Sequence, residues 1–260
     1  MWLINLQKGK RMKQSIFIKS TLTIATLLTL SACGGSTTSN QDEEETRHEV
    51  APEGTSIIHN GTLYGTVVSP YTGRVWLDRN LGAERVCISH TDTACYGDLY
   101  QFGRDYDGHQ DPYSETTKER ATDIDNAGYK FVVRHAWFMY DRNDDSLYKI
   151  SAQLKDKWKR TDGSSVCPPG FYVPTISELN AELGFGDIRI FNVEDAFTEH
   201  FLKVPASGYR RQVDGELKQF GTSFTIWTTY GNVIYFGQND AREGQTGYST
   251  GGSIRCIKKE

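Results

Sequence analysis

One segment combines a cysteine, a Pro-Pro-Gly run and the start of a helix: Cys167-Pro168-Pro169-Gly170-Phe171-Tyr172-Val173-Pro174-Thr175-Ile176-Ser177-Glu178. The side chain of Thr175 can accept hydrogen bonds from the first amides of a helix. Glu178, three residues later, can accept one from the amide of Thr175, which completes a capping box. The pattern predicts a helix from 175 to about Leu183, ended by Gly184.

Around this segment the chain shows few helices and many short strands. Two further helices are predicted, over 194–201 and over 145–159, where an apolar stripe is formed by Leu147, Ile150, Leu154 and Trp158. Short β-forming runs bounded by turn residues cover 65–68, 74–77, 226–230 and 233–236. Without a fixed-period repeat, this order of elements predicts one α+β domain with long irregular loops.

The N-terminal region has the parts of a bacterial lipoprotein signal. A basic start after Met12, which could itself be the initiator, leads into an apolar run and the small-residue cleavage site Leu30-Ser31-Ala32-Cys33. Residues 1–32 are therefore predicted to be removed and Cys33 to carry the lipid. The alternative is a transmembrane helix, but the apolar run is about 15 residues, interrupted by Lys19, where roughly 20 are needed.

This signal predicts a protein of the cell envelope, held to a membrane by acyl chains that do not span it. Gly34 follows the cysteine, where an Asp would indicate retention at an inner membrane, so the outer membrane is favoured. Residues 33–55 are polar and acidic, which predicts a disordered tether ahead of a domain at 56–260.

The charge of the chain becomes strongly acidic once the signal is removed. Residues 1–32 hold five of the 29 basic residues and no acid, so 24 basic and 33 acidic residues remain, a net charge of −9. Nucleic acid and anionic lipid are therefore not expected partners.

Four cysteines remain beside the lipidated one. In an oxidising compartment an even set predicts two disulfides, with three possible pairings. We favour Cys87–Cys95 and Cys167–Cys256, whose loop-closure entropies correspond to roughly 2.5 and 4.5 kcal/mol. A zinc site is the alternative, but the chain has no C-x-x-C, and its one C-x-x-H, ending at His90, has no second ligand pair.

Seven segments in order along 57–258 carry a family resemblance: GRVWLDRNLG (73–82), CYGDLYQFGR (95–104), DGHQ (107–110), CPPGFYVPT (167–175), LKVPASGYR (202–210), IWTT (226–229) and SIRCIK (253–258). With them the chain resembles the Fibrobacter succinogenes major paralogous domain family of secreted and lipid-anchored proteins. The resemblance implies a fold like that of C-type lectins and formylglycine-generating enzymes, with a small twisted antiparallel sheet, one to three helices and long loops. It implies no particular activity.

Neither a catalytic site nor a cofactor is expected. An enzyme of the formylglycine-generating type would need a reactive cysteine, whereas disulfides account for all four. Weak metal candidates, spaced as in a calcium loop but without its turn glycine and bidentate Glu, are Asp141, Asn143 and Asp145. A second acidic cluster, interpreted as solvated turn residues, consists of Asp105, Asp107 and Asp111.

The C-terminal segment 227–253 has the composition of a binding surface, since it is rich in Tyr, Asn, Ser, Thr, Gly and Arg. Candidate ligand-binding residues are Tyr230, Asn232, Tyr235, Asn239, Asp240, Arg242, Tyr248 and Ser249. The alternative is an ordinary half-buried strand, in which Tyr is common. Four tryptophans are expected in the core: Trp76, Trp137, Trp158 and Trp227.

Together these features predict a non-catalytic, lipid-anchored envelope protein whose lectin-like domain binds a glycan, a polymer or a protein. Two alternatives stay open: an extracellular modifying enzyme on the same fold, and a passive structural lipoprotein.

Overall fold

The computed structural model describes residues 54, 56–121, 124–125, 127–134, 137, 152–183 and 190–260. They belong to one compact unit, Val50–Glu260. The predicted signal, Cys33, nearly all of the tether, and the metal candidates Asp141, Asn143 and Asp145 lie outside the described residues. In the part that is described, no helix is long and apolar enough to cross a membrane.

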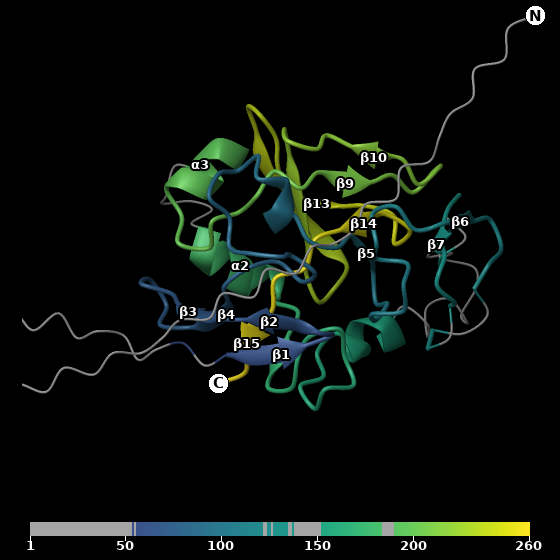
Figure 1. The fold of residues 1–260 in the computed structure, drawn as a ribbon, viewed down its shortest axis with the longest axis horizontal. Coiled ribbons are helices and arrows are strands. Elements are labelled where there is room, and N and C mark those ends of the chain that lie inside the picture. The colour runs from purple at the N-terminus through teal and green to yellow at the C-terminus, as the bar shows by residue number, and fades with distance from the viewer. Residues whose placement is uncertain are drawn as a thin grey trace, which may run out of the picture. The chain divides into compact units, whose positions relative to one another are not determined.

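Within these residues the strands form several small sheets (Figure 1). One antiparallel sheet has the order β3 (Thr66–Val68), β4 (Val75–Leu77), β15 (Ile257–Lys258) and β8 (Phe171–Tyr172). A second has the order β10 (Leu217–Lys218), β9 (Tyr209–Arg210), β14 (Gly251–Gly252) and β5 (Tyr100–Gln101). A third, also antiparallel, consists of β11 (Phe224–Trp227), β12 (Asn232–Phe236) and β13 (Ala241–Gln245).

Two smaller pairs complete the strands of the described chain. An N-terminal hairpin joins β1 (Ile57–His59) to β2 (Thr62–Tyr64), and a short parallel pair joins β6 (Thr116–Thr117) to β7 (Phe131–Val132). The α+β class is thus confirmed.

All four predicted β-forming runs are strands, now β3, β4, β11 and β12. The run at 226–230 was predicted too long, because β11 ends at Trp227. The amide of Thr228 donates to the carbonyl of Asn232 at 2.9 Å and that of Gly231 to the carbonyl of Thr228 at 3.0 Å, which turns the chain into β12.

The capping box forms as predicted at the start of α2 (Ile176–Leu183). The amide of Thr175 donates to Glu178 Oε2 at 2.8 Å, and the amide of Glu178 donates to Thr175 Oγ1 at 3.2 Å. Glu178 also pairs with Arg74 Nη2 at 3.1 Å and accepts a hydrogen bond from the hydroxyl of Tyr172. These contacts fix α2 against the β3–β4–β15–β8 sheet.

The other two helix predictions are met in part. Helix α3 (Val193–Thr198) is shorter than the predicted 194–201, and Asn192 caps it by accepting from the amide of Asp195 at 2.9 Å. Of the predicted 145–159 helix, residues 152–157 are helical, while 145–151 lie outside the described residues.

The core divides into two main clusters on opposite faces of β11 and β12. One contains Trp137, Trp158 and Trp227 together with the Cys167–Cys256 disulfide. The other packs Trp76 and the alternate strand residues Ile226 and Ile234 against α2 and α3. All four tryptophans are 0% exposed, as predicted. Both predicted disulfides, Cys87–Cys95 and Cys167–Cys256, are confirmed.

Buried cations hold the irregular loops. Arg255 bonds the side chain of Asn80 and, at 2.9 Å, the carbonyl of Leu202. Arg210 bonds Ser114 Oγ at 2.6 Å and the carbonyl of Asp111 at 3.1 Å. Since each guanidinium satisfies several carbonyls or side chains, segments without regular pairing keep a fixed position.

The interpretation of Asp105 and Asp107 as solvated turn residues is incomplete, because both partly exposed carboxylates also pair with buried cations. Asp105 pairs with the buried ammonium of Lys157 at 2.7 Å. Asp107 pairs with the buried Arg104 at 2.8 Å and contacts His109 Nδ1 at 2.5 Å. Buried cations require such partners, so these carboxylates serve the interior. Asp111 instead accepts from the amide of Tyr113 at 2.8 Å, as a turn residue does.

A candidate ligand-binding groove

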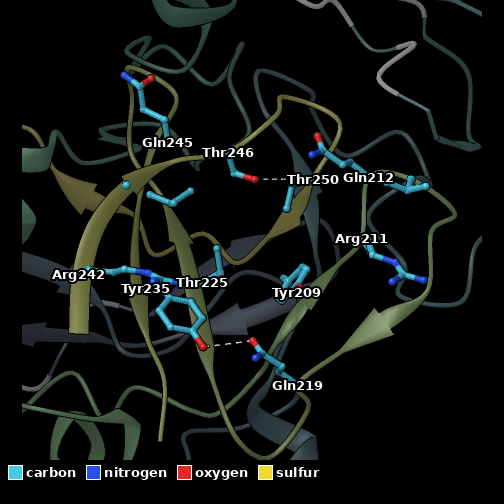
Figure 2. Close-up of a pocket in the computed structure, with 13 residues that line it drawn as sticks. Tyr209, Arg211, Gln212, Gln219, Thr225, Tyr235, Arg242, Gln245, Thr246 and Thr250 are labelled. Carbon is cyan, nitrogen blue, oxygen red and sulfur yellow. Dashed lines mark hydrogen bonds between the residues drawn. The ribbon is translucent and has the colours of Figure 1, made fainter. Parts of the chain in front are cut away.

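A groove of about 440 Å³ lies between the β9–β10 hairpin and one face of the β11–β12–β13 sheet (Figure 2). The sheet contributes Thr225, Val233, Tyr235, Arg242 and Gly244. The hairpin contributes Tyr209, Arg211, Gln212, Val213 and Gln219. One end is lined by Gln245, Thr246 and Thr250.

Strand periodicity explains why these sheet residues share the groove. Tyr235 is paired with Thr225 on one side and with Arg242 on the other, and Val233 is paired with Gly244. Residues directly opposite each other in a sheet point to the same face. The intervening Ile234 and Phe236 point to the other face, where they are 0% exposed in the core.

Two hydrogen bonds brace the walls (Figure 2). The hydroxyl of Tyr235 donates to Gln219 Oε1 at 3.2 Å, which links the sheet to the hairpin. The hydroxyls of Thr246 and Thr250 are 2.8 Å apart at the end of the groove. The groove is therefore a formed feature of the fold, with one wall positioned against the other.

Gly244 leaves the sheet wall open. A Cβ built on this residue meets no atom within 4 Å, and its backbone is that of an ordinary strand residue. Any larger side chain at this position would extend into free space beside Val233. The absence of a side chain at 244 thus enlarges the groove at no cost to the packing.

The lining carries positive charge only. Among the described residues, those that line the groove include Arg211 and Arg242 and no Asp or Glu. Arg211 is paired from outside the groove with Asp214 and Glu216, and the hydrogen bond that it donates to Asp214 raises the pKa of its guanidinium. Arg242 lies over the Tyr235 ring, 4.7 Å from its centroid, with its nearest carboxylate, Asp240, at 3.6 Å.

Only two of the predicted ligand-binding residues, Tyr235 and Arg242, line the groove. Tyr230 is 46% exposed in the β11–β12 turn, outside the groove, and the ammonium of Lys159 lies 4.6 Å from its ring centroid. Asn232 is half-buried at the start of β12, and Asn239 and Asp240 are exposed in the β12–β13 turn.

Ser249 is a correction to that prediction, and Tyr248 is partly buried outside the groove. Ser249 is 1% exposed; its hydroxyl accepts from the amide of Trp137 at 3.2 Å and its carbonyl accepts from Gln101 Nε2 at 2.8 Å. The Tyr248 ring packs 4.6 Å from that of Phe102, against the tryptophan cluster. Both side chains pack against the interior, and neither lines the groove.

The hairpin wall was missed by the sequence reasoning. Tyr209 lies in a segment that carried the family resemblance, yet nothing local marked it as a binding residue. It reaches the groove because β9 pairs with β14 through Arg210 and Gly251, which are far apart in the chain. Only the three-dimensional pairing of these segments could have identified this wall.

The described part of the chain offers neither a cluster of metal ligands nor a free thiol. No group of three or more His, Cys, Asp or Glu side chains is placed to hold a metal ion there. The four described cysteines are all joined in disulfides.

Comparison with known proteins gave no relative: no family model, no curated protein and no solved structure matches this chain.

Proposed function

We propose that this chain is a lipid-anchored protein of the outer membrane that binds a glycan through the groove between the β9–β10 hairpin and the β11–β12–β13 sheet. We further propose that its domain is of the C-type-lectin-like kind and belongs with the Fibrobacter succinogenes major paralogous domain family. The recognition is noncovalent and needs no cofactor.

The composition of the groove supports a glycan. Its walls combine three Gln amides, three Thr hydroxyls and the rings of Tyr209 and Tyr235. Sugars present many hydroxyl groups that both donate and accept, and amides and hydroxyls can pair with them in either sense. Tyr adds rigid contact area at small entropic cost. The volume of about 440 Å³ lies in the range of small-molecule sites.

A groove-filling variant tests the site. In Gly244→Leu the Cβ meets no existing atom and the rest of the side chain extends into the groove, so binding should fall at least ten-fold while the melting temperature does not drop. Gln238→Leu, which adds the same side chain at an exposed turn outside the groove, is the matched control. The measurement is a glycan array probed with the detergent-purified full chain of each variant. Glycan binding that survives Gly244→Leu would place the site elsewhere.

The anchor is tested separately. In Cys33→Ala the thiol that would carry the acyl chains is absent, so the protein should leave the membrane fraction and labelled palmitate should no longer be incorporated. If the variant stays in the membrane with its signal removed, the lipoprotein assignment is wrong.

A further inference from the structure

The charge of the groove indicates which class of glycan it binds, an inference that rests on the proposed function. After loss of residues 1–32 the chain carries a net charge of −9, yet the groove lining holds two arginines and no carboxylate. Salt screens charges over about 8 Å at physiological ionic strength. Acidic residues beyond that distance therefore repel an anion in the groove only weakly. Three nearer carboxylates, those of Asp214, Glu216 and Asp240, lie within 4 Å of the two arginines and offset part of their charge.

The two arginines differ in what they can offer. Arg211 already donates through Nε to Asp214 at 2.9 Å and through Nη2 to Glu216 at 3.0 Å. The guanidinium of Arg242 has no hydrogen bond to any described residue, since Asp240 at 3.6 Å is beyond hydrogen-bonding range. Stacking on the Tyr235 ring orients its plane. A planar guanidinium held in this way can bind a carboxylate through two parallel N–H donors.

A hydrogen-bond acceptor lines the other wall. Gln212 Oε1 is buried beside Gly247 and has no hydrogen-bond partner among the residues that the structure describes. A buried carbonyl oxygen without a partner costs free energy. If the Gln212 side chain turns toward the groove, a ligand hydroxyl or N–H donor can pair with this oxygen and remove that cost. Anionic groups cannot serve there, whereas sugar hydroxyls can.

From these two features we infer that the ligand is an acidic glycan, with an anionic substituent paired to Arg242 and ring hydroxyls bonded to the amide-lined wall. An acidic peptide fits less well, because the lining residues offer amides and hydroxyls in place of apolar pockets for side chains. The anionic group can be a carboxylate or a sulfate, since both accept from a guanidinium.

Matched probes test the inference by calorimetry on the detergent-purified full chain. Polygalacturonate is compared with its fully methyl-esterified form, and dextran sulfate with dextran, so that the two members of each pair share a backbone and differ in their anionic substituent. At least one acidic member should bind ten-fold or more tightly than its neutral counterpart, and its affinity should fall as salt is raised. The pair that responds identifies the anionic group.

Variants assign the effect to one side chain. Arg242→Gln should weaken binding of the acidic probe roughly 10- to 100-fold, as expected for loss of a charge-assisted hydrogen bond. Arg85→Gln is the control, because Arg85 is an exposed arginine on another loop, paired with Asp92. Polyglutamate tests whether charge alone suffices.

The outcomes separate the inference from the proposed function. Equal binding of acidic and neutral probes, both abolished by Gly244→Leu, would overturn the acidic class and leave the glycan groove in place. Equal affinity for polyglutamate and polygalacturonate would overturn the glycan class of this inference. If none of the probes binds at millimolar concentration, the acidic-glycan inference is also overturned. If a glycan binds but Gly244→Leu does not weaken it, both the inference and the proposed groove are overturned.

Discussion

Asp98 shows how one side chain can oppose the stability of the fold at neutral pH. The carboxylate lies against Gly82, whose φ of 77° is readily adopted only by glycine. Burial raises the pKa of Asp98 to about 6, although the hydroxyl of Tyr100 donates to it at 3.2 Å. The folded state therefore favours the protonated acid. Below pH 4 this carboxyl does not lower the free energy of unfolding, but as the pH rises through 6 the buried group must ionise and the free energy of unfolding falls.

We expect Asp98→Asn to raise the free energy of unfolding at pH 7.5 by up to about 3 kcal/mol, the equivalent of a two-unit shift. At pH 4 the variant and the parent should be equally stable, because the parent carboxyl is then protonated. Urea unfolding at the two pH values measures both. Asp156→Asn, at an exposed carboxylate, serves as the control. A variant that is no more stable at pH 7.5 than at pH 4, relative to the parent, would contradict the expectation.

Tyr248 and Tyr230, both predicted to bind a ligand, should differ clearly in how much they contribute to the free energy of unfolding. Tyr248→Ala removes a partly buried ring packed on Phe102 and should cost about 2 kcal/mol, less than truncation of a fully buried aromatic. Tyr230→Ala removes an exposed ring whose contact with Lys159 is worth no more than about 1 kcal/mol. Chemical denaturation of the two variants compares them. Similar losses at both positions would mean that Tyr230 also belongs to the core.

At the scale of single elements, α2 depends on its capping box and on the contacts that join it to the neighbouring sheet. Thr175→Ala should lower the free energy of unfolding by about 1 kcal/mol, the usual value of an N-cap. Glu178→Ala should cost more, because this residue also bonds Tyr172 and pairs with the partly buried Arg74. Thermal unfolding of both variants gives the order. A smaller loss for Glu178→Ala would show that the links to the sheet contribute nothing.

The elements that could be predicted from the sequence are those specified by neighbouring residues. The capping box at 175–178 and the alternation in β12 are short-range signals, and both appear as expected. The groove is different, because Tyr209 and Tyr235 face each other only after β9 has paired with β14. Ser249 was misassigned for the same reason, since its partners Gln101 and Trp137 are more than 100 residues away in sequence. Composition indicates a polar segment but not which side chains a distant strand will cover.

For the whole molecule, the Cys167–Cys256 disulfide ties the middle of the domain to its last strand across a separation of 89 residues. Replacing both cysteines by Ala should lower the free energy of unfolding by roughly 4.5 kcal/mol, against roughly 2.5 kcal/mol for the Cys87–Cys95 pair, whose loop is short. Denaturant titration of the two double variants measures the difference. Equal losses would show that packing around each bridge outweighs loop length.

The alternation along β12 and β13 has a consequence for how this protein can diverge. Residues 235, 242 and 244 line the proposed ligand groove, while Ile234 and Phe236 on the opposite face pack in the core cluster that contains α2 and α3. Selection for a new partner can therefore exchange the groove residues at 235, 242 and 244 while the buried Val233, Ile234 and Phe236 keep the scaffold intact. Such a domain can acquire new specificities many times over while its architecture persists.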